Sequence, residues 1–284
     1  MKNKKDVLGL ELLANKVRED VVKMIYAAGS GHTGGSLSVT DILVSLYFGK
    51  VLNYKAEEPS WADRDRVVLS KGHAAPALYA VLAHAGFFDK KHLKTLRQSG
   101  SILQGHPDMR KIPGVDFNTG SLGQGTSVAA GIAYAARLDG KGYKVYSIVG
   151  DGELQEGMNW EAFILAGNLK LDNLCVIVDK NNLQIDGNVS DINSLEPLEK
   201  KFKAFNFETK EIDGHNYKQI LKSLNYFKNK KRQKPYCIIA NTIKGKGVPE
   251  IEGDYRYHGK PLPKEVYETA IKRFDEIIKK YENN

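Results

Sequence analysis

Two short apolar runs, each followed directly by glycine or polar residues, constrain the fold of this chain most strongly. Residues 143–149 precede the stretch 150–153, which reads GDGE, and residues 174–178 precede 179–182, which reads DKNN. The residues between the two runs have helical periodicity, so the segment is predicted to be one βαβ unit of a parallel sheet. A right-handed crossover brings the carboxyl ends of both strands to one sheet edge, where α/β folds bind ligands. We therefore expect the two loops to face one ligand.

The chemistry of these loops favours a metal-bound diphosphate. Gly150 and Gly152 allow the backbone to approach a bulky group closely, and the helix that follows offers N–H groups to an anion. Asp151 would repel that anion unless a hard cation lay between them. The side-chain oxygen of Asn181 and the carbonyl oxygen of Leu183 can complete an oxygen ligand set. The same set suits Mg²⁺ or Ca²⁺, and the sequence leaves the choice open.

The amino-acid sequence of this region resembles that of transketolases. The stretches GDGELQEGMNWEA at 150–162 and LAGNLKLDNLCVIVDKNNLQIDG at 165–187 contain the thiamine diphosphate motif and are similar to that family almost throughout. The resemblance covers nearly the whole chain, but only the amino-terminal, diphosphate-binding domain of a full transketolase. It implies a three-layer αβα fold with a mainly parallel central sheet and a single domain over residues 1–284. It also implies thiamine diphosphate and Mg²⁺ (or Ca²⁺) as cofactors.

A glycine-rich loop near the amino terminus presents His32. Residues 29–34 read GSGHTG and match the dinucleotide pattern GxGxxG, but that fingerprint needs a preceding strand, and residues 8–28 have the periodicity of a helix. Dinucleotide binding is therefore excluded here. A second helix is predicted at 40–48. The resemblance implies that His32 is an active-site histidine, although Thr33 replaces the proline of many relatives.

Three further histidines lie in loops beside glycine. His73 follows a predicted strand at 66–70, His106 stands in a GHP element, and His258 stands in YHG. The resemblance implies that His73 and His258 stabilise the diphosphate as hydrogen-bond donors, whereas His32 and His106 contact the substrate. These four are the predicted catalytic residues. The other histidines are predicted to be structural or to face solvent: His84, His92 and His215.

The stretch TGSLGQG at 119–125 is a further cofactor element. Its glycines allow close backbone approach, and a helix is predicted from residue 126 onward. The resemblance implies that Gly120 and Leu122 contact the diphosphate and the thiazolium. Glu156 matches a carboxylate at the dimer contact of the family, with solvation on a helix surface as the alternative. The predicted cofactor-binding residues are His73, Gly120, Leu122, Gly150, Asp151, Gly152, Glu153, Glu156, Asn181, Ile185, Ile243 and His258; the predicted metal ligands are Asp151, Asn181 and Leu183.

The resemblance also implies a missing part. In transketolases, the carboxylate that hydrogen-bonds the aminopyrimidine ring of the cofactor lies in a separate pyrimidine-binding domain, for which this chain has no counterpart. We therefore expect a subunit that acts with a carboxy-terminal partner and assembles as a dimer of heterodimers. It would transfer a two-carbon ketol unit from a ketose phosphate to an aldose phosphate. Two alternatives stay open: a subunit of another thiamine diphosphate enzyme, similar to deoxyxylulose-phosphate synthase or an oxo-acid dehydrogenase, and a non-catalytic cofactor-binding protein.

Charge and cysteine content set further limits. The net charge is +8 with a pI of about 9.2, and much of the excess lies in the lysine-rich segment 200–234. This segment has no nucleic-acid motif, so we expect a solvated helical face and no nucleic-acid partner. Cys175 and Cys237 stand in strand-like runs and are predicted to be buried thiols in a reducing cytoplasm. Charges interrupt residues 8–24, so no signal peptide is expected. No apolar run approaches membrane-spanning length, so no membrane span is expected either.

The rest of the chain is predicted to alternate helices and strands. In the helix from residue 126, tight packing against a neighbour is the expected role of Gly131. The stretch KGKG at 244–247 lacks the spacing of a P-loop, so no nucleotide-phosphate cradle is expected there. The remaining predicted helices are 74–85, 90–99, 195–205, 217–229 and 264–281, and the remaining predicted strands are 206–212 and 236–243.

Overall fold

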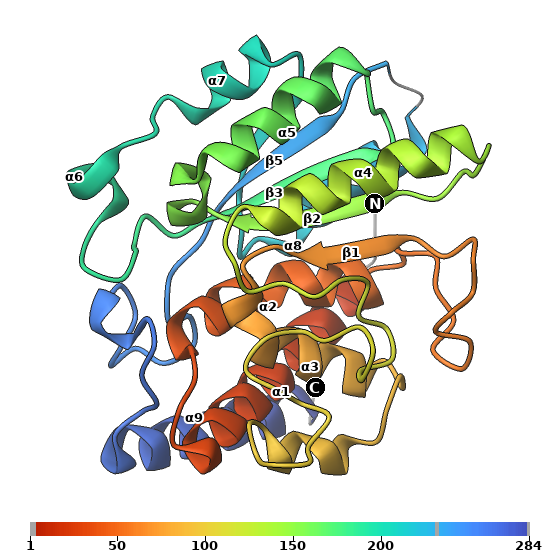
Figure 1. The fold of residues 1–284 in the computed structure, drawn as a ribbon. Coiled ribbons are helices and arrows are strands. Elements are labelled where there is room, and N and C mark those ends of the chain that lie inside the picture. The colour runs from red at the N-terminus through yellow and green to blue at the C-terminus, as the bar shows by residue number, and fades with distance from the viewer. Residues whose placement is uncertain (1–3, 231–232, 283–284) are drawn as a thin grey trace.

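A five-stranded parallel sheet lies at the centre of the protein (Figure 1). The structure is a computed structural model that describes residues 4–230 and 233–282. The strand order is β1-β2-β3-β5-β4, and every neighbouring pair is parallel, which confirms the predicted fold class. The strands are β1 (Arg66–Leu69), β2 (Val145–Gly150), β3 (Leu174–Lys180), β4 (Glu208–Asp213) and β5 (Tyr236–Asn241).

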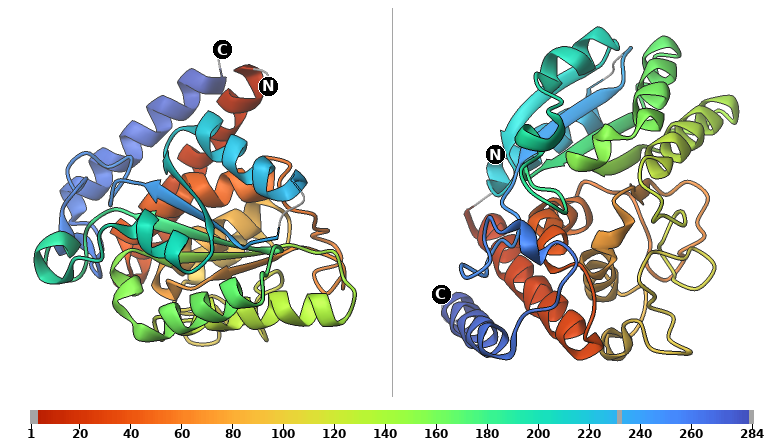
Figure 2. Two further views of the ribbon diagram at one scale, coloured as in Figure 1. Left: turned by 90° about the horizontal axis from the view of Figure 1, so that it is seen from above. Right: turned by 60° about the vertical axis from the view of Figure 1, so that its left-hand side comes forward.

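Helices cover both faces of the sheet and complete three layers (Figure 2). One face carries α4 (Gln124–Leu138), α5 (Gly157–Asn168) and α7 (Leu198–Ala204). The other face carries α2 (Thr33–Phe48), α3 (Ala75–His84) and α8 (Tyr217–Asn229), with α1 (Lys4–Ala28) and α9 (Lys264–Glu282) packed outside them. Among the described residues, no helix has the length and apolarity that a membrane crossing requires.

The strands are buried on both sides, as their continuous apolar runs predict. In β3, Cys175 and Ile177 belong to the core shared with α1, α2 and α3, whereas Val176 and Val178 belong to the core shared with α4, α5 and α7. Cys237 of β5 is also a buried thiol. Because side chains alternate along a strand, one short strand supplies apolar groups to both cores.

The start of α2 differs from the prediction, because the helix begins at Thr33 rather than at residue 40. Its first turns contain Gly34, Gly35 and Ser36, which carry no apolar periodicity and include poor helix formers. All of these residues are buried in the fold, so tertiary packing outweighs local propensity. His32 therefore stands immediately before a buried helix, whereas the prediction left a loop up to residue 39.

Three other local predictions are also corrected. Residues 90–95 form a 3₁₀ helix, η2, in place of an α-helix to residue 99. The predicted helix 195–205 is shortened, because α7 begins only after Pro197. Gly131 is exposed, and a Cβ built on it meets no atom within 4 Å, so the tight packing predicted there is wrong. The remaining short elements are α6 (Val189–Asn193), η1 (Gly72–Ala74), η3 (Gly152–Gln155) and η4 (Tyr255–Tyr257).

Candidate cofactor-binding site

The loops after β2 and β3 lie side by side at the carboxyl edge of the sheet. Gly150 of β2 stands opposite Asp179 of β3, and the next residue, Asp151, accepts a hydrogen bond from the backbone N–H of Asn182 at 2.5 Å. A cavity of about 330 Å³ opens at this edge. Its lining includes these predicted site residues: His73, Leu122, Gly150, Asp151, Gly152, Glu153, Glu156, Asn181, Leu183, Ile185 and His258. Of the predicted cofactor residues, Gly120 and Ile243 do not belong to this lining.

All three predicted metal ligands line the cavity. The backbone N–H of Gly152 donates to Asp151 at 3.0 Å, and Oδ1 of Asn181 accepts from the backbone N–H of Leu183 at 3.1 Å, so both loops are tight turns. Among the described residues, no three His, Cys, Asp or Glu side chains gather as a metal site. A metal here would depend on one carboxylate together with amide and carbonyl oxygens, a set that hard cations accept.

The charge on Asp151 needs compensation. The residue is only 5% exposed, and burial followed by the negative charge of Asp179 raises the pKa of Asp151 to about 6. A buried carboxylate of this kind is stabilised as an anion when a cation lies beside it. The donor set and its electrostatics therefore fit a divalent cation.

Three of the four predicted catalytic histidines form a triangle. The ring centroid of His73 lies 5.0 Å from that of His32 and 5.0 Å from that of His258, and the His32 and His258 centroids lie 5.5 Å apart. His32 precedes α2, His73 lies in η1, and His258 follows η4, so three distant segments meet here. Nδ1 of His32 is buried and has no hydrogen-bond partner in the described structure. An orphaned polar atom of this kind fits a site that receives a polar ligand.

The three imidazoles are neutral near pH 7. Burial and then nearby cations lower the pKa of His32 to about 4 and the pKa of His258 to about 3. Burial and the adjacent Lys71 lower the pKa of His73 well below its usual value. Neutral imidazole can donate one hydrogen bond and accept another. These side chains therefore serve as polar contacts rather than as fixed positive charges.

Two lysines that the sequence reasoning missed supply the positive charge. Lys71 and Lys244 are each only 2% exposed, and both line the cavity. Nζ of Lys71 lies 2.5 Å from Oδ2 of Asp179, which is itself buried, so this charge is compensated within the protein. The signal for Lys71 was its place directly before Gly72 and His73, the loop already selected for its histidine.

The hydrogen bonds of Lys244 go to neutral groups of the described chain rather than to a carboxylate. Its Nζ donates to the carbonyl oxygen of Leu183 at 3.1 Å and to Nδ1 of His258 at 2.9 Å. Burial and then the charge of Lys71 lower the pKa of Lys244 to about 8, so the ammonium form still prevails near pH 7. A buried ammonium beside neutral imidazoles forms a site for an anion.

Comparison with known proteins identifies the family and its fold. The family described as transketolase, thiamine diphosphate binding domain, matches residues 10–275. The chain belongs to this family. The transketolase of Campylobacter jejuni has a TM-score of 0.87 at 35% sequence identity, and the match covers 99% of this chain and 48% of that one.

Two relatives that match over nearly their full length are named as transketolase subunits. A 6-deoxy-6-sulfo-D-fructose transketolase subunit of Clostridium sp. (strain MSTE9) is 44% identical over 264 residues, covering 93% of this chain and 95% of the relative. An apulose-4-phosphate transketolase subunit of Phocaeicola vulgatus is 40% identical over 276 residues, covering 96% of each protein. The human transketolase is 41% identical, but the match covers 91% of this chain and only 41% of that protein. The chain thus spans nearly all of these two subunits and less than half of the human and Campylobacter jejuni transketolases.

Within this transketolase domain, Glu153 is engaged by the protein itself. Its Oε1 accepts from Ser70 at 2.5 Å and from the backbone N–H of Gly123 at 3.0 Å, and its Oε2 accepts from the N–H of Gly150 at 3.0 Å. The carboxylate therefore joins the ends of β1 and β2 to the glycine-rich loop before α4. It lines the cavity, and its hydrogen bonds hold the walls of the site in place.

His106 and Gly120 lie together at the margin of the site. A Cβ built on Gly120, whose φ is 153°, would lie 3.0 Å from the His106 ring. The glycine therefore allows the ring to pack against the loop. His106 is exposed, and its positive form would lower the pKa of His32, so the two imidazoles belong to one electrostatic neighbourhood. His106 nevertheless lies outside the histidine triangle.

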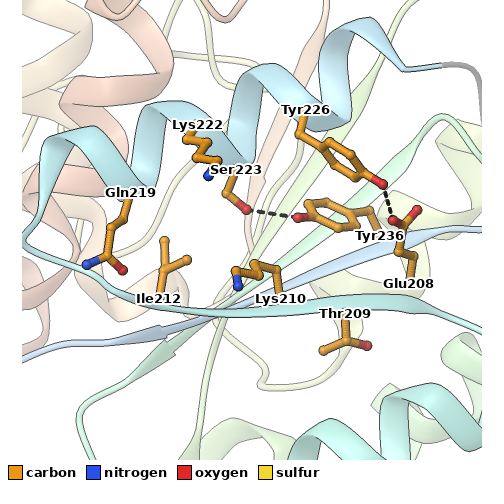
Figure 3. Close-up of a pocket in the computed structure, with 9 residues that line it drawn as sticks. All are labelled: Glu208, Thr209, Lys210, Ile212, Gln219, Lys222, Ser223, Tyr226 and Tyr236. Carbon is orange, nitrogen blue, oxygen red and sulfur yellow. Dashed lines mark hydrogen bonds between the residues drawn. The ribbon is translucent and has the colours of Figure 1, made fainter. Parts of the chain in front are cut away.

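A second cavity of about 500 Å³ lies along β4 and α8, and it differs in character (Figure 3). Ser223 and the hydroxyl of Tyr236 lie 3.0 Å apart, and Tyr226 donates to Glu208, so polar groups of this lining pair with each other. None of its lining residues is glycine or histidine. The close backbone approach and the imidazole donors of the first cavity are missing from this lining.

Proposed function

We propose that this chain is the thiamine diphosphate-binding subunit of a two-chain transketolase, which transfers a two-carbon ketol unit from a ketose phosphate to an aldose phosphate. The observation that supports this proposal best is that an oxygen ligand set, neutral imidazoles and the Lys244 ammonium lie together at one sheet edge. Both halves of that arrangement suit a metal diphosphate. Residues 1–284 would act as one domain in this assembly.

Asp151, Asn181 and Leu183 would hold Mg²⁺ (or Ca²⁺) through a carboxylate, an amide and a carbonyl oxygen. The cation would compensate the buried charge of Asp151, whose pKa burial and Asp179 raise to about 6. It would also allow a diphosphate to lie near that carboxylate without repulsion.

Lys244, His73 and His258 would bind the diphosphate oxygens, because all three line the cavity and carry N–H donors. When bound, thiamine diphosphate supplies the carbanion chemistry of its thiazolium ring. His32 and His106 would contact the sugar hydroxyls, where neutral imidazoles can accept or return protons. The orphaned Nδ1 of His32 supports a polar partner at this place.

A partner subunit would supply the pyrimidine-binding domain with its activating carboxylate. The chain spans less than half of the single-chain transketolases, and the relatives that it matches over nearly their full length are named as subunits. Exposed apolar side chains on α4 and α5 support a docking face for this partner, and α4 packs beside α5 (Figure 1). They are Tyr134, Leu138, Met158, Ile164 and Leu165. Two such heterodimers would form a dimer of heterodimers, with Glu156 of the cavity lining near the contact.

The compartment and the sugar are further parts of the proposal. Buried thiols at Cys175 and Cys237 suit a reducing cytoplasm. The two subunit relatives are named for a sulfonated ketose and for a phosphorylated apulose, so both a phosphate and a sulfonate on the distal carbon are candidate recognition groups for the substrate.

The test is ketol transfer from a ketose phosphate to ribose 5-phosphate with Mg²⁺ and thiamine diphosphate, using this chain alone and then mixed with its pyrimidine-domain partner. Transfer only in the mixture is the expected result. Transfer by the chain alone would show that the activating carboxylate lies in this chain. A donor panel that includes a sulfonated ketose and an oxo acid separates the substrate choices. A complex that binds the cofactor and transfers nothing from any donor would contradict the transketolase proposal.

A further inference from the structure

Asp41 of α2 is a buried carboxylate that forms hydrogen bonds with side chains of other elements. Arg18 of α1 donates from Nη2 to Oδ2 at 2.5 Å, Tyr217 of α8 donates to Oδ1 at 2.6 Å, and Nδ1 of His215 lies 2.6 Å from Oδ2. Burial alone would raise the pKa of Asp41, but Arg18 and His215 outweigh it and hold the pKa well below its usual value. Asp41 is therefore a fixed negative charge where α1, α2 and α8 meet.

One tautomer of His215 satisfies both of its neighbours. Nε2 lies 2.8 Å from the backbone nitrogen of Ile243, which can only donate, so Nε2 must accept. The proton is then on Nδ1 and is donated to Asp41. The side chain of His215 is only 13% exposed. The expectation that this histidine is merely structural or faces solvent therefore omits a specific bridge between a buried anion and a loop backbone.

Hydrogen bonds fix the backbone around His215. Its backbone N–H donates to Oδ1 of Asp213 at 2.8 Å, and the N–H of Gly214 donates to the carbonyl oxygen of Asn241 at 2.7 Å. Gln219, on the first turns of α8 (Figure 3), accepts from the N–H of Asp213 at 3.1 Å. With both the backbone and Nδ1 anchored, the position of Nε2 is determined by the fold rather than by the loop it contacts.

The loop after β5, which His215 contacts at Ile243, carries Lys244 into the cofactor site. The N–H of Thr242 donates to the carbonyl oxygen of Lys180 at 2.9 Å, and the N–H of Gly245 donates to the carbonyl oxygen of Gly34 at 3.0 Å. The backbone is therefore held on each side of Ile243 and Lys244. Between these ties, the N–H of Ile243 is held by His215. A rotation of this peptide unit would move Lys244 away from Leu183 and His258, which its Nζ contacts.

We propose that His215 is a positioning residue for cofactor binding: anchored on Asp41, it holds the backbone of Ile243 and so places the Lys244 ammonium in the diphosphate site. This inference rests on the proposed function, in which Lys244 binds the diphosphate. It assigns to Ile243 an indirect role, because its peptide group transmits the position of the imidazole. Second-layer hydrogen bonds of this kind orient the groups that touch a ligand.

Two substitutions separate the two bonds of the imidazole. His215→Gln places an acceptor near the position of Nε2 and can keep the bond to Ile243, whereas His215→Asn places a donor near the position of Nδ1 and can keep the bond to Asp41. Tyr217→Phe is the matched control, because it removes a hydrogen bond to the same carboxylate without touching the loop. Binding of thiamine diphosphate with Mg²⁺ is measured by titration calorimetry on the complex with the partner subunit, and thermal unfolding is measured on the same samples.

We expect His215→Asn to weaken cofactor binding roughly 10-fold to 100-fold, as loss of second-layer support does at ligand sites. His215→Gln should recover most of that loss, and Tyr217→Phe should keep the affinity within about twofold although it lowers the unfolding temperature. Affinity that follows the unfolding temperature across all three variants, or that is kept better by Asn than by Gln, overturns the proposal. Failure of the wild-type complex to bind the cofactor would instead overturn the proposed function.

Discussion

Nζ of Lys244 lies 2.9 Å from Nδ1 of His258, and in this pair the ammonium donates while the imidazole accepts. The arrangement requires a neutral His258 whose proton is on Nε2, and burial with the adjacent ammonium lowers the pKa of His258 to about 3 accordingly. The site thus combines the Lys244 ammonium with neutral donors, while Asp179 compensates the charge of Lys71. It attracts an anion and leaves the imidazoles neutral near pH 7, so that each can donate one hydrogen bond and accept another.

The first prediction concerns this ammonium. Lys244→Met keeps the length of the side chain and removes its charge, so binding of thiamine diphosphate with Mg²⁺ should weaken roughly 10-fold to 100-fold, the value of a hydrogen bond to a charged group. Titration calorimetry on the complex measures this change. Lys246→Met is the control, because Lys246 lies near Glu252 at 3.7 Å and does not line the cavity. Equal affinities for the two variants would contradict the assignment of Lys244.

The second prediction concerns the metal. Asp151→Ala removes the one carboxylate of the proposed ligand set, so the affinity for thiamine diphosphate should lose its dependence on Mg²⁺. The measurement is a cofactor titration at several Mg²⁺ concentrations. Asp191→Ala, which removes an exposed carboxylate on α6, should leave that dependence unchanged. Normal Mg²⁺-dependent affinity in Asp151→Ala would show that the metal is held elsewhere.

The sequence was enough to place Asp151 and Asn181 together, because a general rule on parallel strands applies to both residues. Each follows a short buried strand, and the carboxyl ends of strands joined by one crossover helix meet at one sheet edge. The structure bears out this neighbourhood through the hydrogen bond from the N–H of Asn182 to Asp151. The resemblance to transketolases then indicated the ligand, which spacing alone left as a metal diphosphate.

Lys244 could not be placed in the same way, because sequence order does not give strand order. It follows β5, which lies directly beside β3, while β4 occupies the outer position although it comes earlier in the chain. The bridge made by His215 is harder still, since Asp41 and Ile243 belong to segments far apart in sequence. Local patterns report periodicity and turns, whereas such contacts depend on how whole elements pack.

The third prediction concerns the buried anchor. Asp41→Asn leaves the Arg18 guanidinium buried without its counter-charge, which should lower the free energy of unfolding by about 3–5 kcal/mol near pH 7. The folded-state pKa of Asp41 lies below the unfolded value, so the unfolded chain binds more protons in that range and stability falls as the solution becomes more acidic. The contribution is complete above the unfolded pKa of about 3.9 and declines below it.

Urea unfolding of the wild type and of Asp41→Asn between about pH 7 and pH 3 measures this contribution. The difference in unfolding free energy should be constant down to about pH 4 and should narrow at lower pH. A difference that is the same at every pH would show that the charge of Asp41 is not what stabilises the fold.

The last prediction compares two glycines of α4. A Cβ built on Gly125 would lie 2.6 Å from Cα of Ser70, whereas one built on Gly131 meets nothing within 4 Å. Gly131→Ala should therefore raise the free energy of unfolding by about 0.5–1 kcal/mol through helix propensity, and Gly125→Ala should lower it by about 1–3 kcal/mol through overpacking. Urea unfolding of the chain measures both. Both substitutions add one methyl group to the same helix, so a difference in sign between the two changes in unfolding free energy reports the contact between the start of α4 and the end of β1. Equal changes in the two variants would exclude that close contact.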